Sequence, residues 1–170
     1  MSRRVSRKSG DGSSDKDMRE PQTTLRRYSA ADEDAAIALR RRTWQVAYPE
    51  INFDARHAWW RKRWQDEMTP TADIVVAEGP EGMIGFVTVD PKTGYLDQLL
   101  VAPEAWGGGV AGSLMDEAKR IAPGALFLYV NRDNARAVRF YKKHGFTVTE
   151  NSVNPTSGRP TFLMRWAKQA

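Results

Sequence analysis

The type and spacing of three consecutive glycines, Gly107–Gly109, suggest a chemical function in this 170-residue chain. They follow a short apolar run that ends at Val101, and apolar side chains then recur at helical spacing from Val110 to Ala122. Glycine lets a backbone adopt positive φ and approach a ligand closely, and the first N–H groups of a helix carry partial positive charge. The turn is therefore a candidate phosphate cradle. A strand-to-helix turn without a ligand also favours glycine, so the run alone leaves both interpretations open.

A second segment that could do chemistry begins at Asn134. The apolar run at 125–130 predicts a buried strand, and Asn134 stands where a side chain could cap the following helix. Gly145 is placed to end that helix. One face of the helix is expected to consist of Ala137, Val138, Phe140 and Tyr141. The phenol of Tyr141 is the acidic proton on this otherwise apolar face.

Together the two segments resemble the GCN5-related N-acetyltransferase (GNAT) superfamily. Its acetyl-CoA turn, Gln/Arg-x-x-Gly-x-Gly/Ala, is matched at Trp106–Ala111, except that Trp106 replaces Gln or Arg. A side-chain donor to the pyrophosphate is missing there, while the backbone N–H groups are retained, so we expect weakened or rearranged cofactor contacts rather than none. The later family motif, Asn-x-x-Ala-x-x-Phe-Tyr-x-x-x-Gly-Phe, is matched by Asn134, Ala137, Phe140, Tyr141, Gly145 and Phe146.

The resemblance implies an acetyl-CoA-dependent N-acetyltransferase, in which a primary amine of a small molecule or peptide attacks the thioester directly. The strand before the turn would pair through its backbone with the pantetheine arm, and the turn amides would bind the pyrophosphate. Asn134 would bind pantetheine or hold the helix start, and Tyr141 would protonate the leaving thiolate. The acetyl-CoA contacts expected are Leu99, Leu100, Val101, Trp106, Gly107, Gly108, Gly109, Val110, Ala111, Gly112, Asn134 and Tyr141.

Asp97 is the first candidate for the base that takes the proton from the amine. Under a period of two it shares a face with Leu99, unless a bulge intervenes. Some polyamine acetyltransferases of the family place their proposed base at this position. A solvated carboxylate is the alternative interpretation. Tyr95 stands where histone acetyltransferases of the family carry Glu, and Glu78 is the third candidate.

The acceptor side of the cleft is expected in the first two helices and their link, as the resemblance implies. This region is rich in aromatic residues, and Trp44, Tyr48 and Trp60 are candidates for shaping an acceptor pocket. Tryptophans at helical spacing also pack in cores, so a purely structural role is the alternative.

The elements that must position these residues form an α+β pattern. Helices are expected from Ser29, which carries a Ser-x-x-Asp capping pattern, to about Val46, and from Asp54 to about Glu67. Strands are expected at 23–28, 73–78, 83–89, 95–101, 125–130, 147–153 and 161–166. The result is a mixed, mostly antiparallel sheet of about seven strands with about four helices, which is the GNAT arrangement.

Composition limits the alternatives. Residues 1–22 have almost no large apolar side chains and are expected to form a disordered tail before one acetyltransferase domain at 23–170. Cysteine is absent and the two histidines lie far apart, so no metal site is expected. No run is long and apolar enough for a membrane span, and a cytoplasmic enzyme is expected.

The net charge of +5 suits a polyanionic cofactor or nucleic acid. We expect no nucleic-acid or membrane partner, and the sequence allows a homodimer. The alternatives are transfer of another acyl group, a different acceptor such as an amino-acid-derived antibiotic, a non-catalytic CoA-binding module of the same fold, or a nucleic-acid-binding protein. Trp106, and Tyr95 in place of Glu, keep the non-catalytic alternative open.

Overall fold

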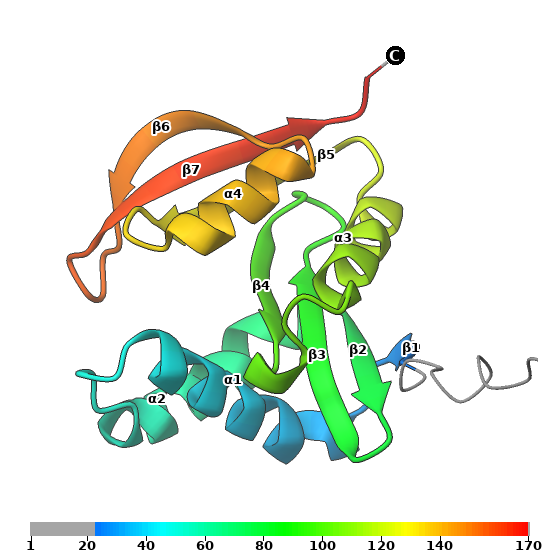
Figure 1. Cartoon of the computed structure of the whole chain (residues 1–170), viewed down its shortest axis with the longest axis vertical. Coiled ribbons are helices and arrows are strands. Elements are labelled where there is room, and N and C mark those ends of the chain that lie inside the picture. Colours follow the sequence, from blue (N-terminus) through cyan, green and yellow to red (C-terminus); the bar gives the residue numbers. More distant parts are fainter. Residues whose placement is uncertain (1–22, 170) are drawn as a thin grey trace, which may run out of the picture.

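The computed structural model describes residues 23–169, and the tail expected at 1–22 lies outside them. The described chain contains four α-helices and seven strands, which confirms the expected α+β class. In Figure 1, α4 and the strands β6 and β7 lie in the upper part, α1 and α2 in the lower part, and β4 between them. The elements are β1 Thr24–Arg27, α1 Glu33–Ala47, α2 His57–Arg63, β2 Asp73–Gly79, β3 Gly82–Val89, β4 Leu96–Val101, α3 Val110–Ile121, β5 Ala125–Asn131, α4 Ala135–Lys143, β6 Thr147–Val153 and β7 Pro160–Ala167.

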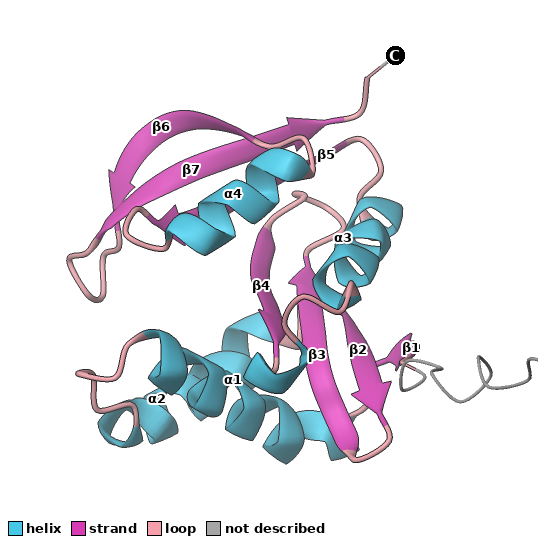
Figure 2. Cartoon of the chain, viewed as in Figure 1, coloured by secondary structure: helices cyan, strands magenta, loops and turns pink. Residues whose placement is uncertain are grey.

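The strands form two sheets rather than one continuous sheet (Figure 2). The first is antiparallel in the order β1-β2-β3-β4, and the second is antiparallel in the order β5-β7-β6. Tyr95, just before β4, makes an isolated parallel bridge to Phe127 of β5. Beyond this bridge β4 is the edge strand of the first sheet, so its outer edge is available for pairing.

Alternation along β2 divides the core. Ile74 and Val76 point into a cluster with α1 and α2, whereas Val75 and Ala77 point into a cluster with α3. The α3 cluster continues into β5, α4 and β7 and thereby packs the two sheets together. None of the helices in the part of the chain that the structure describes combines the length and apolarity needed to cross a membrane.

The first two helical segments begin as the sequence predicts. The Asp32 carboxylate accepts a hydrogen bond from the Ser29 backbone N–H at 2.8 Å, and a short 3-10 turn then leads into α1. The second segment changes geometry along its length, from a 3-10 turn at Asp54–Arg56 through α2 to a π-helical turn at Trp64–Met68. The Trp64 side chain in this π-helical turn is fully buried against the first sheet.

A bulge in β4 changes the direction of Asp97. Thr88 of β3 lies opposite Gln98 and Val89 lies opposite Leu96, so Asp97 is the additional residue. Leu96 and Leu99 consequently pack with the same core cluster. The Asp97 carboxylate instead meets Arg63 of α2. The bulge breaks the period of two, and this is the condition under which Asp97 and Leu99 were not expected to share a face.

Candidate active site

A cleft of about 310 Å³ lies between the edge of β4 and the start of α4. It brings together most of the side chains that the sequence singles out, although they come from four separate elements. Its lining includes Asp97, Leu99, Leu100, Val101, Trp106, Ala111, Asn134 and Tyr141. We call this space the β4–α4 cleft. Its walls are an open strand edge on one side and a helix start on the other.

The glycine turn leads from the end of β4 into α3. Gly107 and Gly109 have φ values of 83° and 82°, a conformation that side chains rarely adopt. A Cβ atom at either position would meet no heavy atom within 4 Å, so the backbone there faces open space. Gly109 is the N-cap of α3, and its carbonyl accepts the hydrogen bond from the Ser113 N–H at 3.1 Å. The N–H groups of the first helical turn are thus left without intrahelical partners, as a phosphate cradle requires.

Trp106 is held in place at the mouth of this turn. Its indole Nε1 donates a hydrogen bond to the Val101 carbonyl at 2.8 Å, so this donor is used within the protein. The guanidinium of Arg136 lies over the Trp106 ring, 4.0 Å from the ring centroid. Both residues line the β4–α4 cleft. A positive charge from α4 therefore stands beside the turn, on the side chain that replaces the Gln or Arg of the motif.

Asn134 and Tyr141 occupy opposite ends of α4. The Asn134 side chain caps the helix by accepting a hydrogen bond from the Ala137 N–H at 3.2 Å. Tyr141 is 9% exposed, packs its ring against Phe140 and Phe146, and makes no side-chain hydrogen bond within residues 23–169. Burial raises the pKa of Tyr141 to about 12, so the phenol keeps its proton at neutral pH.

A second cavity of about 580 Å³ adjoins the first. We call it the aromatic pocket, because Trp44, Tyr48, Phe53, Trp59, Trp60, Tyr95 and Tyr129 contribute to its lining. Six residues line both spaces: Trp44, Tyr48, Tyr129, Asn131, Asn154 and Thr161. The sequence-predicted acceptor residues Trp44, Tyr48 and Trp60 therefore all lie at this pocket, and the first two lie where it meets the cleft.

Hydrogen bonds and stacking fix the junction of the two cavities. The Tyr48 hydroxyl accepts a hydrogen bond from Asn131 Nδ2 at 2.9 Å and donates one to Asp133 Oδ1 at 3.0 Å. Its ring stacks on Trp44 with centroids 5.7 Å apart. Tyr48 therefore links the end of α1 to the end of β5, and both elements contribute residues to the two cavities.

Asp97 lies at the cleft in an ion pair. Its Oδ2 atom is 2.6 Å from Nη2 of Arg63, its side chain is 14% exposed, and its Oδ1 accepts a hydrogen bond from Gln98. Arg63 also lines the aromatic pocket. The Asp97–Arg63 pair therefore joins the lining of the β4–α4 cleft to that of the aromatic pocket.

The two other candidate bases have different surroundings. Burial, together with the charge of Asp97, raises the pKa of Tyr95 to about 12, so this phenol is a poor proton acceptor at neutral pH. Glu78 lies on β2 and binds Arg26 at 2.6 Å, in a cluster with Asp32 that borders neither cavity. Hydrogen bonding to Arg26 lowers the pKa of Glu78. Glu78 therefore lies apart from both cavities, although it was a candidate for the base.

Several residues at the cavities were missed from the sequence. Arg63 and Asn131 gave no signal beyond their charge or polarity. Arg40 gave a usable one, because it continues the inward-facing series of α1 at helical spacing after Ala36 and Ile37 and four residues before Trp44. The Arg-Arg-Arg run around it conceals the difference between this arginine and its outward-facing neighbours.

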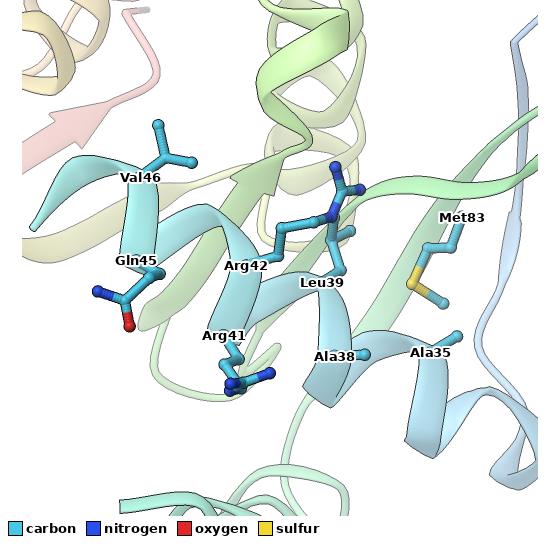
Figure 3. Close-up of a pocket in the computed structure, with 8 residues that line it drawn as sticks. All are labelled: Ala35, Ala38, Leu39, Arg41, Arg42, Gln45, Val46 and Met83. Atoms are coloured by element: carbon cyan, nitrogen blue, oxygen red, sulfur yellow. The ribbon is translucent and has the colours of Figure 1, made fainter. Parts of the chain in front are cut away.

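A further depression lies on the outer side of α1 and is lined by Ala35, Ala38, Leu39, Arg41, Arg42, Gln45, Val46 and Met83 (Figure 3). It shares no lining residue with the cleft or the aromatic pocket. Its lining contains no carboxylate, and the guanidinium of Arg42 is already paired with Glu104 at 2.6 Å. This depression therefore has no groups suited to acyl transfer.

Comparison with known proteins matches residues 34–146 to the model of the acetyltransferase (GNAT) family. A peptidyl-lysine N-acetyltransferase, YjaB of Salmonella typhimurium, is 28% identical over 148 residues, which cover 82% of this chain and 94% of the relative. YjaB of Escherichia coli is 30% identical over 122 residues, covering 67% and 81%. Among solved structures, the PaiA N-acetyltransferase of Thermoplasma acidophilum in complex with coenzyme A has a TM-score of 0.70 at 22% identity, covering 86% of this chain and 99% of that one.

Proposed function

The chain belongs to the acetyltransferase (GNAT) family, and from this premise we propose that it transfers the acetyl group of acetyl-CoA to a primary amine bound in the aromatic pocket. Its relatives are N-acetyltransferases, and the fold neighbour PaiA was solved with coenzyme A. Acetyl-CoA is therefore the donor, and the acceptor amine belongs to a small molecule or peptide.

The observation that carries this proposal is the meeting of two cavities at the edge of β4. An open strand edge can pair with an extended polar chain, and the backbone of Leu99–Val101 offers that edge to the pantetheine arm. The glycine turn at one end of the cleft would take the pyrophosphate. At the other end, the thioester would face an amine held beside the stacked rings of Trp44 and Tyr48, where the cleft meets the aromatic pocket.

The reaction needs three contributions from the chain besides positioning: an oxyanion donor, a proton acceptor and a proton donor. The amine nitrogen forms a bond to the thioester carbonyl carbon, and a backbone N–H of Leu99–Val101 stabilises the developing oxyanion. The carbon–sulfur bond then breaks. The proton lost by the amine passes to Asp97, directly or through water, and the thiolate receives one from the Tyr141 hydroxyl. The products are the acetamide and coenzyme A. Asp97 then returns its proton to solvent and solvent reprotonates the Tyr141 phenolate, so charge and protons balance over the cycle.

Replacing Asp97 by Asn tests its role as base. We expect kcat/KM to fall about 100-fold, the low end for a general base, because water can take part of the proton load. The loss should be greatest at low pH, where more of the amine is protonated. Rates of thiol release measured across pH for the variant and the parent check this.

Arg63→Gln is the matched control, because it removes the partner of Asp97 and keeps the carboxylate. If Asp97 only positions Arg63, then Asp97→Asn and Arg63→Gln should lower kcat/KM by the same factor at every pH. That result would contradict the assignment of Asp97 as base.

Arg136 is expected to supply the charge that the Trp106 substitution removes from the turn. Arg136→Gln should weaken coenzyme A binding about fivefold to tenfold, which corresponds to one charge-assisted contact at a partly exposed site. Isothermal titration at two salt concentrations measures both the affinity and its ionic component. Arg139→Gln, an exposed change on the same helix away from the cleft, should leave affinity unchanged. If Arg136→Gln and Arg139→Gln weaken coenzyme A binding equally, the affinity depends on the net charge of the protein and not on the position of Arg136.

The proposed function itself is tested by mixing the purified protein with acetyl-CoA and a panel of primary amines while thiol release is followed. Amine-dependent release with formation of the acetamide supports the proposal. Tight coenzyme A binding without release for any amine would favour a non-catalytic module instead.

A further inference from the structure

Arg40 is a largely buried cation without a partner in the part of the chain that the structure describes. Its Nε atom is shielded from solvent and makes no hydrogen bond. The guanidinium lies over the ring of Trp60, 3.4 Å from the centroid, and 5.1 Å from that of Trp44. Its neighbours in the arginine run differ, because Arg41 pairs with Asp54 and Arg42 with Glu104.

This arrangement is costly for the protein alone. Burial, and then the like charge of Arg63, lower the pKa of Arg40 to about 9, so the side chain remains charged at neutral pH. Cation–π contacts with the two tryptophans compensate only part of the lost hydration. A buried charge is normally paired, and removing an uncompensated one is often neutral or stabilising. The position of Arg40 is therefore better explained by a ligand than by stability.

Other unpaired donors gather around the same pocket. The indole Nε1 atoms of Trp44 and Trp60 and the Oγ1 atom of Thr161 are buried without hydrogen-bond partners, and all three residues line the aromatic pocket. Buried polar groups are paired in the great majority of cases, so these atoms lack the partner, either bound water or a ligand, that such groups usually have. The lining also holds Arg56, Arg63 and Arg159 but a single carboxylate, Glu67. Arg63 is paired with Asp97 and Glu67, and Arg159 with Asp133 and Glu50. Among the described residues, Arg40 and the exposed Arg56 are therefore the lining cations that are left for an anion.

From these contacts we propose that the acceptor is a small amine that also carries a carboxylate, which the Arg40 guanidinium binds while the amine faces the β4–α4 cleft. The planar fork of a guanidinium matches the two oxygens of a carboxylate. The aromatic walls would pack an apolar or aromatic side chain that branches from the carbon carrying the amine and the carboxylate, as in an aromatic amino acid. This inference rests on the proposed acetyl transfer for the role of the amine. It also disfavours polyamines and lysine-rich segments, which the arginines would repel.

The first experiment measures recognition without chemistry. Isothermal titration with 3-phenylpropanoate and with its amide, 3-phenylpropanamide, should give at least about tenfold tighter binding of the carboxylate, one charge-assisted contact. Arg40→Met should remove that difference, and Arg40→Lys should restore part of it. Arg41→Met, the outward-facing neighbour, should bind like the parent. Equal binding of acid and amide by the parent, or a preference that survives in Arg40→Met, would overturn the proposal.

The melting temperature of Arg40→Met separates a ligand-binding role from a structural one. A buried arginine kept for binding predicts a melting temperature equal to or above that of the parent. A lower melting temperature with carboxylate preference retained would make Arg40 a structural clamp between tryptophans and would overturn the proposal.

The second experiment adds chemistry. Thiol release from acetyl-CoA is compared for phenylalanine, phenylalaninamide and 2-phenylethylamine, and the parent should favour phenylalanine in kcat/KM by about tenfold or more. In Arg40→Met the ratio should approach one. If none of the three amines causes thiol release while the carboxylate still binds, the result would count against acetyl transfer and leave the anion site standing. Acetylation of all three amines at equal rates would count against the anion site and leave acetyl transfer standing.

Discussion

Tyr141→Phe should reduce kcat by about 10²- to 10⁴-fold, the range expected for loss of one general acid. The thiolate of coenzyme A needs a proton donor as the tetrahedral intermediate collapses. Tyr141 lines the cleft, and its hydroxyl has no hydrogen-bond partner among residues 23–169. Phenylalanine keeps the ring that packs against Phe140 and Phe146. Affinity for acetyl-CoA should therefore change little, and single-turnover measurements should locate the loss in the chemical step.

Stability provides the control for this variant. Because the hydroxyl makes no hydrogen bond to residues 23–169, Tyr141→Phe should leave the melting temperature unchanged or slightly raised. The parent should also show no alkaline loss of kcat from this group below about pH 10, since burial raises its pKa to about 12 and the proton is retained up to that range. A variant with parental kcat under conditions where chemistry limits the rate would assign Tyr141 to the core.

Gly109→Asp should weaken acetyl-CoA binding by about 100-fold or more, or roughly 2.7 kcal/mol. Gly109 caps α3 with φ of 82°, and a Cβ there would project into open space beside the N–H groups of the first turn. A carboxylate in that space would repel the pyrophosphate. It would also bind the N–H groups of the first turn, whose partial positive charge is expected to bind the pyrophosphate. Isothermal titration with coenzyme A measures the loss.

Gly109→Asn is its matched control. Asparagine has nearly the same shape as aspartate and tolerates the left-handed conformation equally well, but it is neutral. It should lose much less affinity than Gly109→Asp, whereas equal losses would trace the effect to bulk or strain. Unchanged affinity in both variants would place the pyrophosphate away from this turn.

Local signals made most of the fold predictable from the sequence. The Ser29–Asp32 capping pattern, the apolar periodicity of α3 and the Gly145 stop each act within a few residues, and the structure confirms all three. The division into two sheets was not predictable, because pairing between β4 and β5 depends on distant backbone geometry. The bulge at Asp97 was also missed, since it arises from the fit of β4 to β3 and to Arg63 rather than from glycine or proline in the strand.

The site was predictable where motifs carry it and unpredictable where tertiary contacts do. Trp106, Ala111, Asn134 and Tyr141 line the cleft, whereas Gly107–Val110 and Gly112 are not among its lining residues. The roles of all these residues remain predictions. Trp106 also shows the limit of motif reasoning, since the position that lacks the motif's side chain is neighboured by Arg136 from another element. Arg40 and Arg63 can be interpreted only from the structure, because Arg63 is paired with Asp97 whereas Arg40 has no carboxylate partner among the described residues.

The narrow backbone connection between the sheets has a consequence for how the molecule opens. Apart from packing in the shared α3 cluster, the sheets meet through the Tyr95–Phe127 bridge and the hydrogen bond from the Phe127 N–H to the Gly94 carbonyl at 3.0 Å. Such a boundary is where cooperative unfolding units separate. If acetyl-CoA spans β4 and α4 as proposed, it binds only while the two sheets are packed together, so at 100 times its Kd it raises the free energy of their separation by about 2.7 kcal/mol. Amide exchange at this boundary then reports occupancy of the cleft, and the cell's supply of donor sets how often the two units separate.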